Sequence, residues 1–425
     1  MAPARPLSPA LPERLSSLDG LRGVAAVVVL VHHALLTVPL LARAYADSGA
    51  SVPEGTLAWW LAYSPLHLAW AGREAVFLFF VLSGVVVTLP ALRSPGFDWV
   101  AFYPRRIVRI YGPVAAALAF GLVLTLLVPR FNDHVLGHWM NSRPNTVSVG
   151  DVLKDLVLVD GSSGTVSPLW SLQWEMLFSA FLPFFVAIAL LVRRRPRTVL
   201  AVVTAALVLG SFYSGKAMFY LAMFAIGAVL VGLWDRVARL GRRMSTRRWA
   251  WPVVVLAALL CTSAVWSAQG LGVSAGRAER MSWIAVPGVV ALLLAAAFWR
   301  PAVRLLDTRL LQWLGRISFS LYLVHEPIVI AVRFLLVRHH VPTAVSIAIA
   351  IPLALLAAVL FAWIVEQPFH RLARRAGKAV AAASRELVQS QRTRADGPPV
   401  TSSVPVVVRG AAVARPATAE EPALR

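Results

Sequence analysis

Ten apolar segments, each long enough to cross a lipid bilayer as a helix, recur along this chain. Only 14% of the residues are charged and 58% are hydrophobic, whereas about 25% of the residues in a soluble domain are charged. Inside lipid the backbone must satisfy its own hydrogen bonds, so such segments form helices. We therefore predict an all-α polytopic integral membrane protein with about ten transmembrane helices. The predicted spans cover residues 20–42, 68–91, 107–128, 168–192, 198–213, 217–234, 250–269, 282–299, 317–337 and 342–365.

The basic residues indicate how these spans are oriented. The chain carries a net charge of +21, and its Lys and Arg residues concentrate in the connections after the second, fourth, sixth and eighth spans. Cytoplasmic loops carry such an excess, so we predict a multi-pass protein of the cell membrane with both termini in the cytoplasm. The same placement explains the charge without a nucleic-acid partner. We predict a transmembrane domain at residues 15–372, a disordered cytoplasmic N-terminus at 1–14 and a disordered cytoplasmic tail at 373–425.

The first span contains four ionisable residues, Asp19, Arg22, His32 and His33. Such groups are costly in lipid and usually face a protein interior or a wet cavity. Eleven residues close about three helical turns, so Arg22 and His33 share a face and lie roughly 16 Å apart along the axis. Asp19 lies one turn from Arg22 and can pair with it. We predict a functional role for His33 and a satisfied packing contact for His32, which points about 100° away. Arg22 alone could also be a simple anchor of the helix end.

The third span opens with Arg106 and Arg109, which are three positions apart and therefore face the same way. With both termini inside, they lie at the same cytoplasmic level as Arg22. Converging guanidinium groups suit a phosphate or a diphosphate. A role in topology alone would explain these two arginines as well.

The fourth span carries Glu175, which we place roughly 10 Å inside the membrane from the outer side, at the level of His33. A carboxylate and an imidazole at one level could form an orienting pair or an acceptor site. Alternatively, Glu175 is a structural carboxylate paired with an arginine such as Arg73. His325 lies inside the ninth span, and Glu366 ends the tenth at the cytoplasmic edge, where it can pair with the arginines.

No metal site is predicted from the histidines of the external loop. His134 and His138 are four positions apart, which is a spacing that metal ligands use, but no third ligand accompanies them. The single cysteine, Cys261, excludes an internal disulfide and a thiolate cluster.

Six segments together resemble the bacterial acyltransferase-3 family of membrane O-acylases. In chain order they read SLDGLRGVAAVVVLVHH, FLFFVLSG, RRIVRIYGP, LWSLQWE, ISFSLYLVH and EQPF, and the resemblance covers about residues 15–372. It implies transfer of an acyl group, commonly acetyl from cytoplasmic acetyl-CoA, to hydroxyl groups of glycans or other acceptors. The family's signature of an arginine followed, after ten residues, by a histidine falls on Arg22 and His33. Its RxxR motif falls on Arg106 and Arg109. Ser83 in FLFFVLSG is a further candidate site residue. Phe77 stands where members often have an acidic residue, which puts a role for that carboxylate in doubt.

The resemblance gives the four residues of the first span a hypothetical use. Acyl-CoA would be a donor substrate rather than a bound cofactor, with its phosphates held by the arginines and its arm reaching towards His33. A neutral histidine at that point could take the proton of an acceptor hydroxyl as general base. A covalent acyl-histidine remains an alternative at this stage.

Two other readings remain open from the sequence. The acceptor could be a cell-envelope glycan or a small metabolite such as a macrolide sugar. A transporter or flippase could use the same buried His, Glu and Arg residues as a proton or substrate path. The oligomeric state is unknown.

Overall fold

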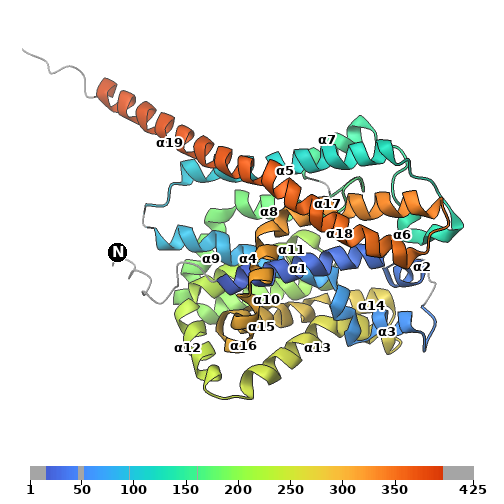
Figure 1. Cartoon of the computed structure of the whole chain (residues 1–425). Coiled ribbons are helices and arrows are strands. Elements are labelled where there is room, and N and C mark those ends of the chain that lie inside the picture. Colours follow the sequence, from blue (N-terminus) through green and yellow to red (C-terminus); the bar gives the residue numbers. More distant parts are fainter. Residues whose placement is uncertain (1–15, 46–51, 95, 160, 396–425) are drawn as a thin grey trace, which may run out of the picture.

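The computed structural model describes residues 16–45, 52–94, 96–159 and 161–395, and every regular element within these ranges is a helix (Figure 1). Seven helices in this part of the chain are long and apolar enough to cross a membrane. They are α1 (Ser16–Leu35), α4 (Gly72–Arg93), α5 (Trp99–Leu127), α13 (Ala250–Gly270), α15 (Ala285–Phe298) together with the residues from Ala275, α17 (Arg309–Val337) and α18 (Thr343–Phe361) with its continuation. The prediction of an all-α polytopic membrane protein is confirmed.

Two bent pairs of helices are further candidate spans. One pair is α8 (Leu169–Ala180) and α9 (Leu182–Arg194), which bend by 68°, and the other is α11 (Lys216–Gly232) and α12 (Trp234–Ser245), which bend by 79°. Counting each pair once raises the number of candidate spans to nine among the described residues. The shorter apolar helix α10 (Pro196–Phe212) occupies the position predicted for the fifth span.

Short helices fill the connections between the spans. They are α2 (Pro39–Ala42), η1 (Arg43–Tyr45), α3 (Leu57–Tyr63), η2 (Pro65–Trp70), η3 (His134–Leu136), α6 (Gly137–Asn141), α7 (Val149–Val157), α14 (Ala275–Glu279), η4 (Ser282–Ile284), α16 (Arg300–Leu306) and η5 (Ala362–Glu366). Of these, η3, α6 and α7 belong to the connection between α5 and α8, residues 128–168, which we call the loop segment.

Helix α1 lies between two apolar cores and packs tightly on α17. Its side chains contribute both to the core that contains α4, α9, α10, α11 and α15 and to the core that contains α5, α17 and α18. Close packing here depends on glycine, because a Cβ atom on Gly23 would lie 2.5 Å from the amide nitrogen of Gly315 in α17, and one on Gly20 would lie 2.1 Å from the carbonyl oxygen of Leu306 in α16. Small residues allow membrane helices to approach in this way.

Helix α18 continues through a short π-helical turn, η5, into α19 (Gln367–Ala395). The predicted disorder is therefore wrong for residues 373–395, while residues 1–14 and 396–425 lie outside the described part of the chain. Ala373, Gly377 and Ala381 recur every four residues and form a smooth face, and Gly377 lies against the backbone of Ala101 at the start of α5. The amino-acid composition of the tail does not reveal that these small residues recur every four positions. Figure 1 shows α19 running past α5 and beyond the rest of the bundle.

Candidate active site

The histidines of α1 and α17 meet inside the bundle. Nδ1 of His33 lies 3.0 Å from Nε2 of His325, and the two ring centroids are 4.9 Å apart. His325 is fully buried, whereas His33 is partly accessible. The sequence identified both residues as candidates, but only the fold shows that they form a pair.

The surrounding carbonyl groups determine where the protons of the neutral pair lie. Nδ1 of His325 is 2.8 Å from the carbonyl oxygen of Leu321, and because a carbonyl can only accept, this nitrogen carries the proton. Nε2 of His325 is then an acceptor. Nδ1 of His33 faces that acceptor and also the carbonyl oxygen of Val29 at 3.0 Å, so it too is protonated. The remaining nitrogen of His33, Nε2, therefore holds a free lone pair and is the basic atom of the pair.

His32 has a packing role, as predicted. Its ring is buried and stacks on the ring of Trp70, and its Nδ1 lies 2.9 Å from the carbonyl oxygen of Trp70. Gly72 is required beside it, because an added Cβ would lie 2.5 Å from the His32 ring. Behind it, Nε2 of His67 lies 2.9 Å from the hydroxyl of Tyr45, and burial lowers the pKa of His67 well below its usual value.

A cavity of about 380 Å³ lies at the other end of α1 and gathers the predicted arginines. Its polar lining consists of Arg22, Ser83, Arg105, Arg106, Arg109, Ser171, Glu175, Ser318 and Tyr322. The convergence of Arg22, Arg106 and Arg109 that their spacing suggested is present, and Arg105, which the sequence analysis passed over, joins them. We call this space the arginine cavity. Such a group of guanidinium ions can bind a ligand that carries several phosphate charges.

Glu175 lies in the arginine cavity and is bound to an arginine there. Nη2 of Arg106 donates to its Oε1 at 2.5 Å, and the Ser83 hydroxyl is 3.4 Å from the same oxygen. Of the alternatives that the sequence left open, the structure shows a carboxylate paired with an arginine, and that arginine is Arg106 rather than Arg73. Helix α8 begins among buried residues, Pro168 and Leu169, and carries Glu175 into the lining of the arginine cavity.

Tyr322 lies between the arginine cavity and the histidine pair. It lines the cavity, and its ring centroid is 6.1 Å from that of His325. Its hydroxyl is 2.6 Å from the hydroxyl of Ser171 and 3.1 Å from the carbonyl oxygen of Pro168. These bonds hold Tyr322 against the first turn of α8, so its ring lines the cavity and at the same time lies beside His325.

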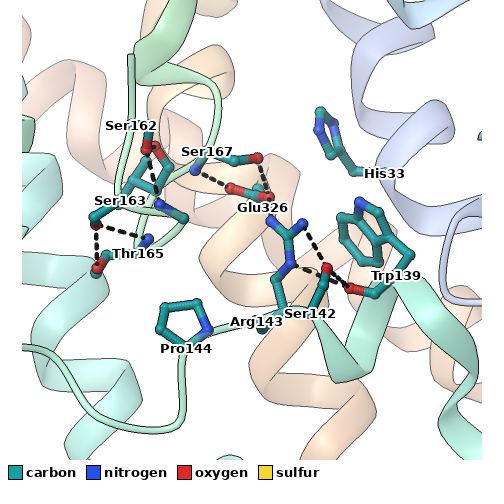
Figure 2. A network of polar contacts seen from close by, with 12 residues as sticks. His33, Trp139, Ser142, Arg143, Pro144, Ser162, Ser163, Thr165, Ser167 and Glu326 are labelled. Carbon is teal, nitrogen blue, oxygen red and sulfur yellow. Dashed lines mark hydrogen bonds and ion pairs between the residues drawn. The ribbon is translucent and has the colours of Figure 1, made fainter. Parts of the chain in front are cut away.

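The loop segment reaches His33 through Trp139 and α17 through Glu326 (Figure 2). Arg143 lies 3.1 Å from Oε1 of Glu326, the residue that follows His325. Ser167 donates its backbone N–H and its hydroxyl to the same carboxylate. The ring of Trp139 has its centroid 6.0 Å from that of His33. Arg143, Ser167 and Trp139 could not be identified from sequence, because loop residues show no periodicity that would relate them to α17.

The remaining candidates have partners elsewhere. Arg73 binds Glu74 at 2.9 Å and also Glu279, away from the arginine cavity. Glu366 accepts a hydrogen bond from Ser320 at 2.5 Å and lies within electrostatic range of Arg22 and Arg109. These arginines are the neighbours that its sequence position suggested.

Asp19 and Phe77 both lie in packing contacts between helices. Asp19 stands in the first turn of α1, where its backbone carbonyl packs on Gly315. Phe77, where the resemblance implied an acidic residue, is buried against Phe219.

Comparison with known proteins identifies one family. A family model described as an acyltransferase domain matches residues 15–366, which includes α1, the arginine cavity, the loop segment and the histidine pair. No curated protein and no solved structure matches the chain.

Proposed function

The chain belongs to the acyltransferase-3 family, and from this premise we propose that it moves an acyl group, in the simplest case acetyl, from cytoplasmic acyl-CoA to a hydroxyl of a cell-envelope glycan. As a multi-pass protein of the cell membrane it would receive its donor on one side and its acceptor on the other. The observation that carries the proposal is that one helix, α1, lines the arginine cavity through Arg22 and contacts His325 through His33.

The arginine cavity supports the donor half of this reaction. Acyl-CoA has a head with several phosphate charges, and Arg22, Arg106 and Arg109 offer a matching group of cations around a space of about 380 Å³. Guanidinium groups bind phosphate in a bidentate, charge-assisted manner. The thioester end would then lie at Tyr322, next to the histidine pair.

The length of α1 fits the length of the donor. Arg22 and His33 are separated by three turns, or roughly 16 Å, a distance that the thin arm of acyl-CoA can span. A donor anchored by its phosphates therefore has its reactive carbonyl close to His33 once Tyr322 moves aside. Holding both reactants in place in this way removes much of the entropic cost of the reaction.

The histidine pair supports general-base catalysis. Nε2 of His33 takes the proton of the acceptor hydroxyl, the hydroxyl oxygen attacks the thioester carbonyl carbon, and the carbon–sulfur bond breaks to release CoA thiolate. The thiolate then recovers the proton from the His33 imidazolium. His325 assists because its Nε2 accepts from Nδ1 of His33 at 3.0 Å, which orients the base and stabilises its charged form. A covalent route would instead place the acyl group on His33 Nε2 first.

The test uses membranes from cells that produce the protein, with labelled acetyl-CoA as donor and the cell envelope of a strain lacking the gene as acceptor. We expect label in the glycan fraction with wild-type membranes and none with His33→Ala membranes that contain the same amount of protein. Label trapped on the protein itself after acid quenching would support the covalent route. If cells lacking the gene lose envelope acylation while membranes consume no acetyl-CoA, the protein is a transporter and the proposal is wrong.

A further inference from the structure

Glu326 joins α17 to the loop segment at the residue next to His325. Its side chain is completely buried, and a buried carboxylate is costly unless it is paired and hydrogen-bonded. Its partners among the described residues come from the loop segment, namely the guanidinium group of Arg143 and both donors of Ser167. The position of the loop segment relative to the histidine pair is therefore fixed at this point.

Arg143 also holds Trp139 from two directions. Its guanidinium carbon lies 4.6 Å from the centroid of the Trp139 ring, and its Nε donates to the Trp139 carbonyl oxygen at 3.2 Å. Nη1 of the same guanidinium binds Glu326. Because the planar group makes all three contacts at once, the place of the Trp139 ring depends on the ion pair between Arg143 and Glu326. Figure 2 shows this arrangement with His33 beside Trp139.

Trp139 contacts the histidine that the mechanism uses. Its ring is inclined by 48° to that of His33, with the centroids 6.0 Å apart, and it is partly accessible. The arginine cavity, whose lining contains no residue of the loop segment, lies on the other side of Tyr322. A group that approaches His33 from the loop segment therefore meets Trp139 and does not compete with the donor.

Resting on the function proposed above, we propose that Trp139 binds the acceptor beside His33 and that Arg143 and Glu326 are positioning residues that hold Trp139 there. A sugar ring has a face of C–H bonds that packs on an indole, while its hydroxyl groups remain free at the edge. Trp offers a large apolar surface of this kind with little rotational freedom. An acceptor packed on Trp139 has a hydroxyl next to the basic nitrogen of His33.

The experiment measures initial rates of glycan labelling while acetyl-CoA and the envelope preparation are varied in turn. Trp139→Ala should raise the KM for the envelope acceptor by about tenfold, the scale of a lost aromatic contact, and leave the KM for acetyl-CoA unchanged. Arg143→Ala should act in the same direction because it releases the ring. The double variant should be little worse than either single variant, since two residues that act through one contact are not additive. Trp139→Phe keeps an aromatic face and should recover most of the loss.

Arg338 provides a matched control. Its guanidinium carbon lies 4.9 Å from the centroid of Phe131, and it donates to the Pro129 carbonyl at 2.9 Å, so it makes similar contacts with the loop segment away from His33. Arg338→Ala should leave both KM values unchanged. If Arg143→Ala does not accumulate, Glu326→Gln and the two Trp139 variants provide the same comparison. An unchanged acceptor KM in Trp139→Ala would overturn this inference, whereas a wild-type protein that labels no glycan would overturn the proposed function instead.

Discussion

Nδ1 of His33 lies 3.0 Å from Nε2 of His325, although 292 positions separate them in the chain. The carbonyl of Leu321 requires a proton on Nδ1 of His325, and this in turn leaves Nε2 of His33 as the free base. The relationship resembles the orienting pairs of other general-base sites, in which one partner fixes the tautomer of the other. Because only His33 is paired in this way, replacing His33 and replacing His32 should have different effects on the reaction rate.

His33→Ala should abolish turnover, and His32→Ala should not. Loss of a general base lowers a rate by about 10²–10⁴, while the arginine cavity and donor binding remain intact. His32 packs on Trp70 and takes no part in the pair, so its removal should reduce thermal stability with little change in the rate per folded molecule. Glycan labelling together with thermal melting in detergent separates the two effects. Substantial turnover by His33→Ala would contradict the mechanism.

His325→Ala should lower kcat without changing the KM for acetyl-CoA. The variant leaves His33 without its orienting acceptor, and groups of this kind contribute about 10–100-fold in other sites. His325→Gln should restore part of the rate, because an amide oxygen can accept from Nδ1 of His33. Equal rates for the Ala and Gln variants would show that His325 only fills space.

Arg106→Ala should chiefly raise the KM for acetyl-CoA. A charge-assisted hydrogen bond contributes about 1.5–3 kcal/mol, which corresponds to roughly 10–100-fold. Arg316, an exposed residue of α17 outside the cavity lining, is the control, and Arg316→Ala should leave donor saturation unchanged. If the rate of Arg106→Ala depends on the acetyl-CoA concentration as the wild-type rate does, Arg106 contributes to membrane topology alone.

Glu175→Gln should lower the KM for acetyl-CoA. In the structure the carboxylate holds Arg106 at 2.5 Å, so it competes with the phosphate that the same guanidinium would bind. The amide removes the competing charge and keeps a hydrogen-bonding group of similar size. Donor titrations on Glu175→Gln and wild-type membranes provide the measurement. A loss of turnover as deep as that of His33→Ala would instead restore the catalytic role that the sequence suggested for Glu175.

Cysteine labelling tests the orientation in the membrane. In a Cys261→Ala background, an impermeant maleimide added to intact cells should modify Asn145→Cys in the loop segment and spare Arg243→Cys in α12. Both positions are exposed, so both should react after the cells are lysed. The reverse pattern would place the arginine cavity outside the cell, where it would not meet cytoplasmic acyl-CoA.

Most of the spans and several residues of the site could be predicted from local sequence. Apolar length and turn residues predicted most of the spans, and a helical repeat of 3.6 residues brought Arg106 and Arg109 onto one face and distinguished His33 from His32. These inferences need only the geometry of one helix. They carry over to the structure because α1 and α5, which hold these residues, are each one continuous helix.

The rest depends on contacts between distant segments. The pairing of Arg143 with Glu326 and the placement of Glu175 beside Arg106 are set by how α8 and the loop segment pack on α5 and α17. No periodicity in either partner encodes such a distance. Residues 373–395 were misassigned for a different reason: the tail as a whole is rich in Ala, Arg, Pro, Ser and Val without a clear period, yet Ala373, Gly377 and Ala381 recur every four residues and fit the surface of α5.

The glycine contacts between α1 and α17 have a consequence for how such an enzyme can diversify. Gly23 and Gly315 hold the two helices in close contact, so the histidine pair is complete without the loop segment or α5. Residues 128–168 can therefore change, as a cassette, to suit a new acceptor while the base and its partner stay in register. Exchanging residues 128–168 between family members should transfer the acceptor specificity and leave the donor specificity unchanged.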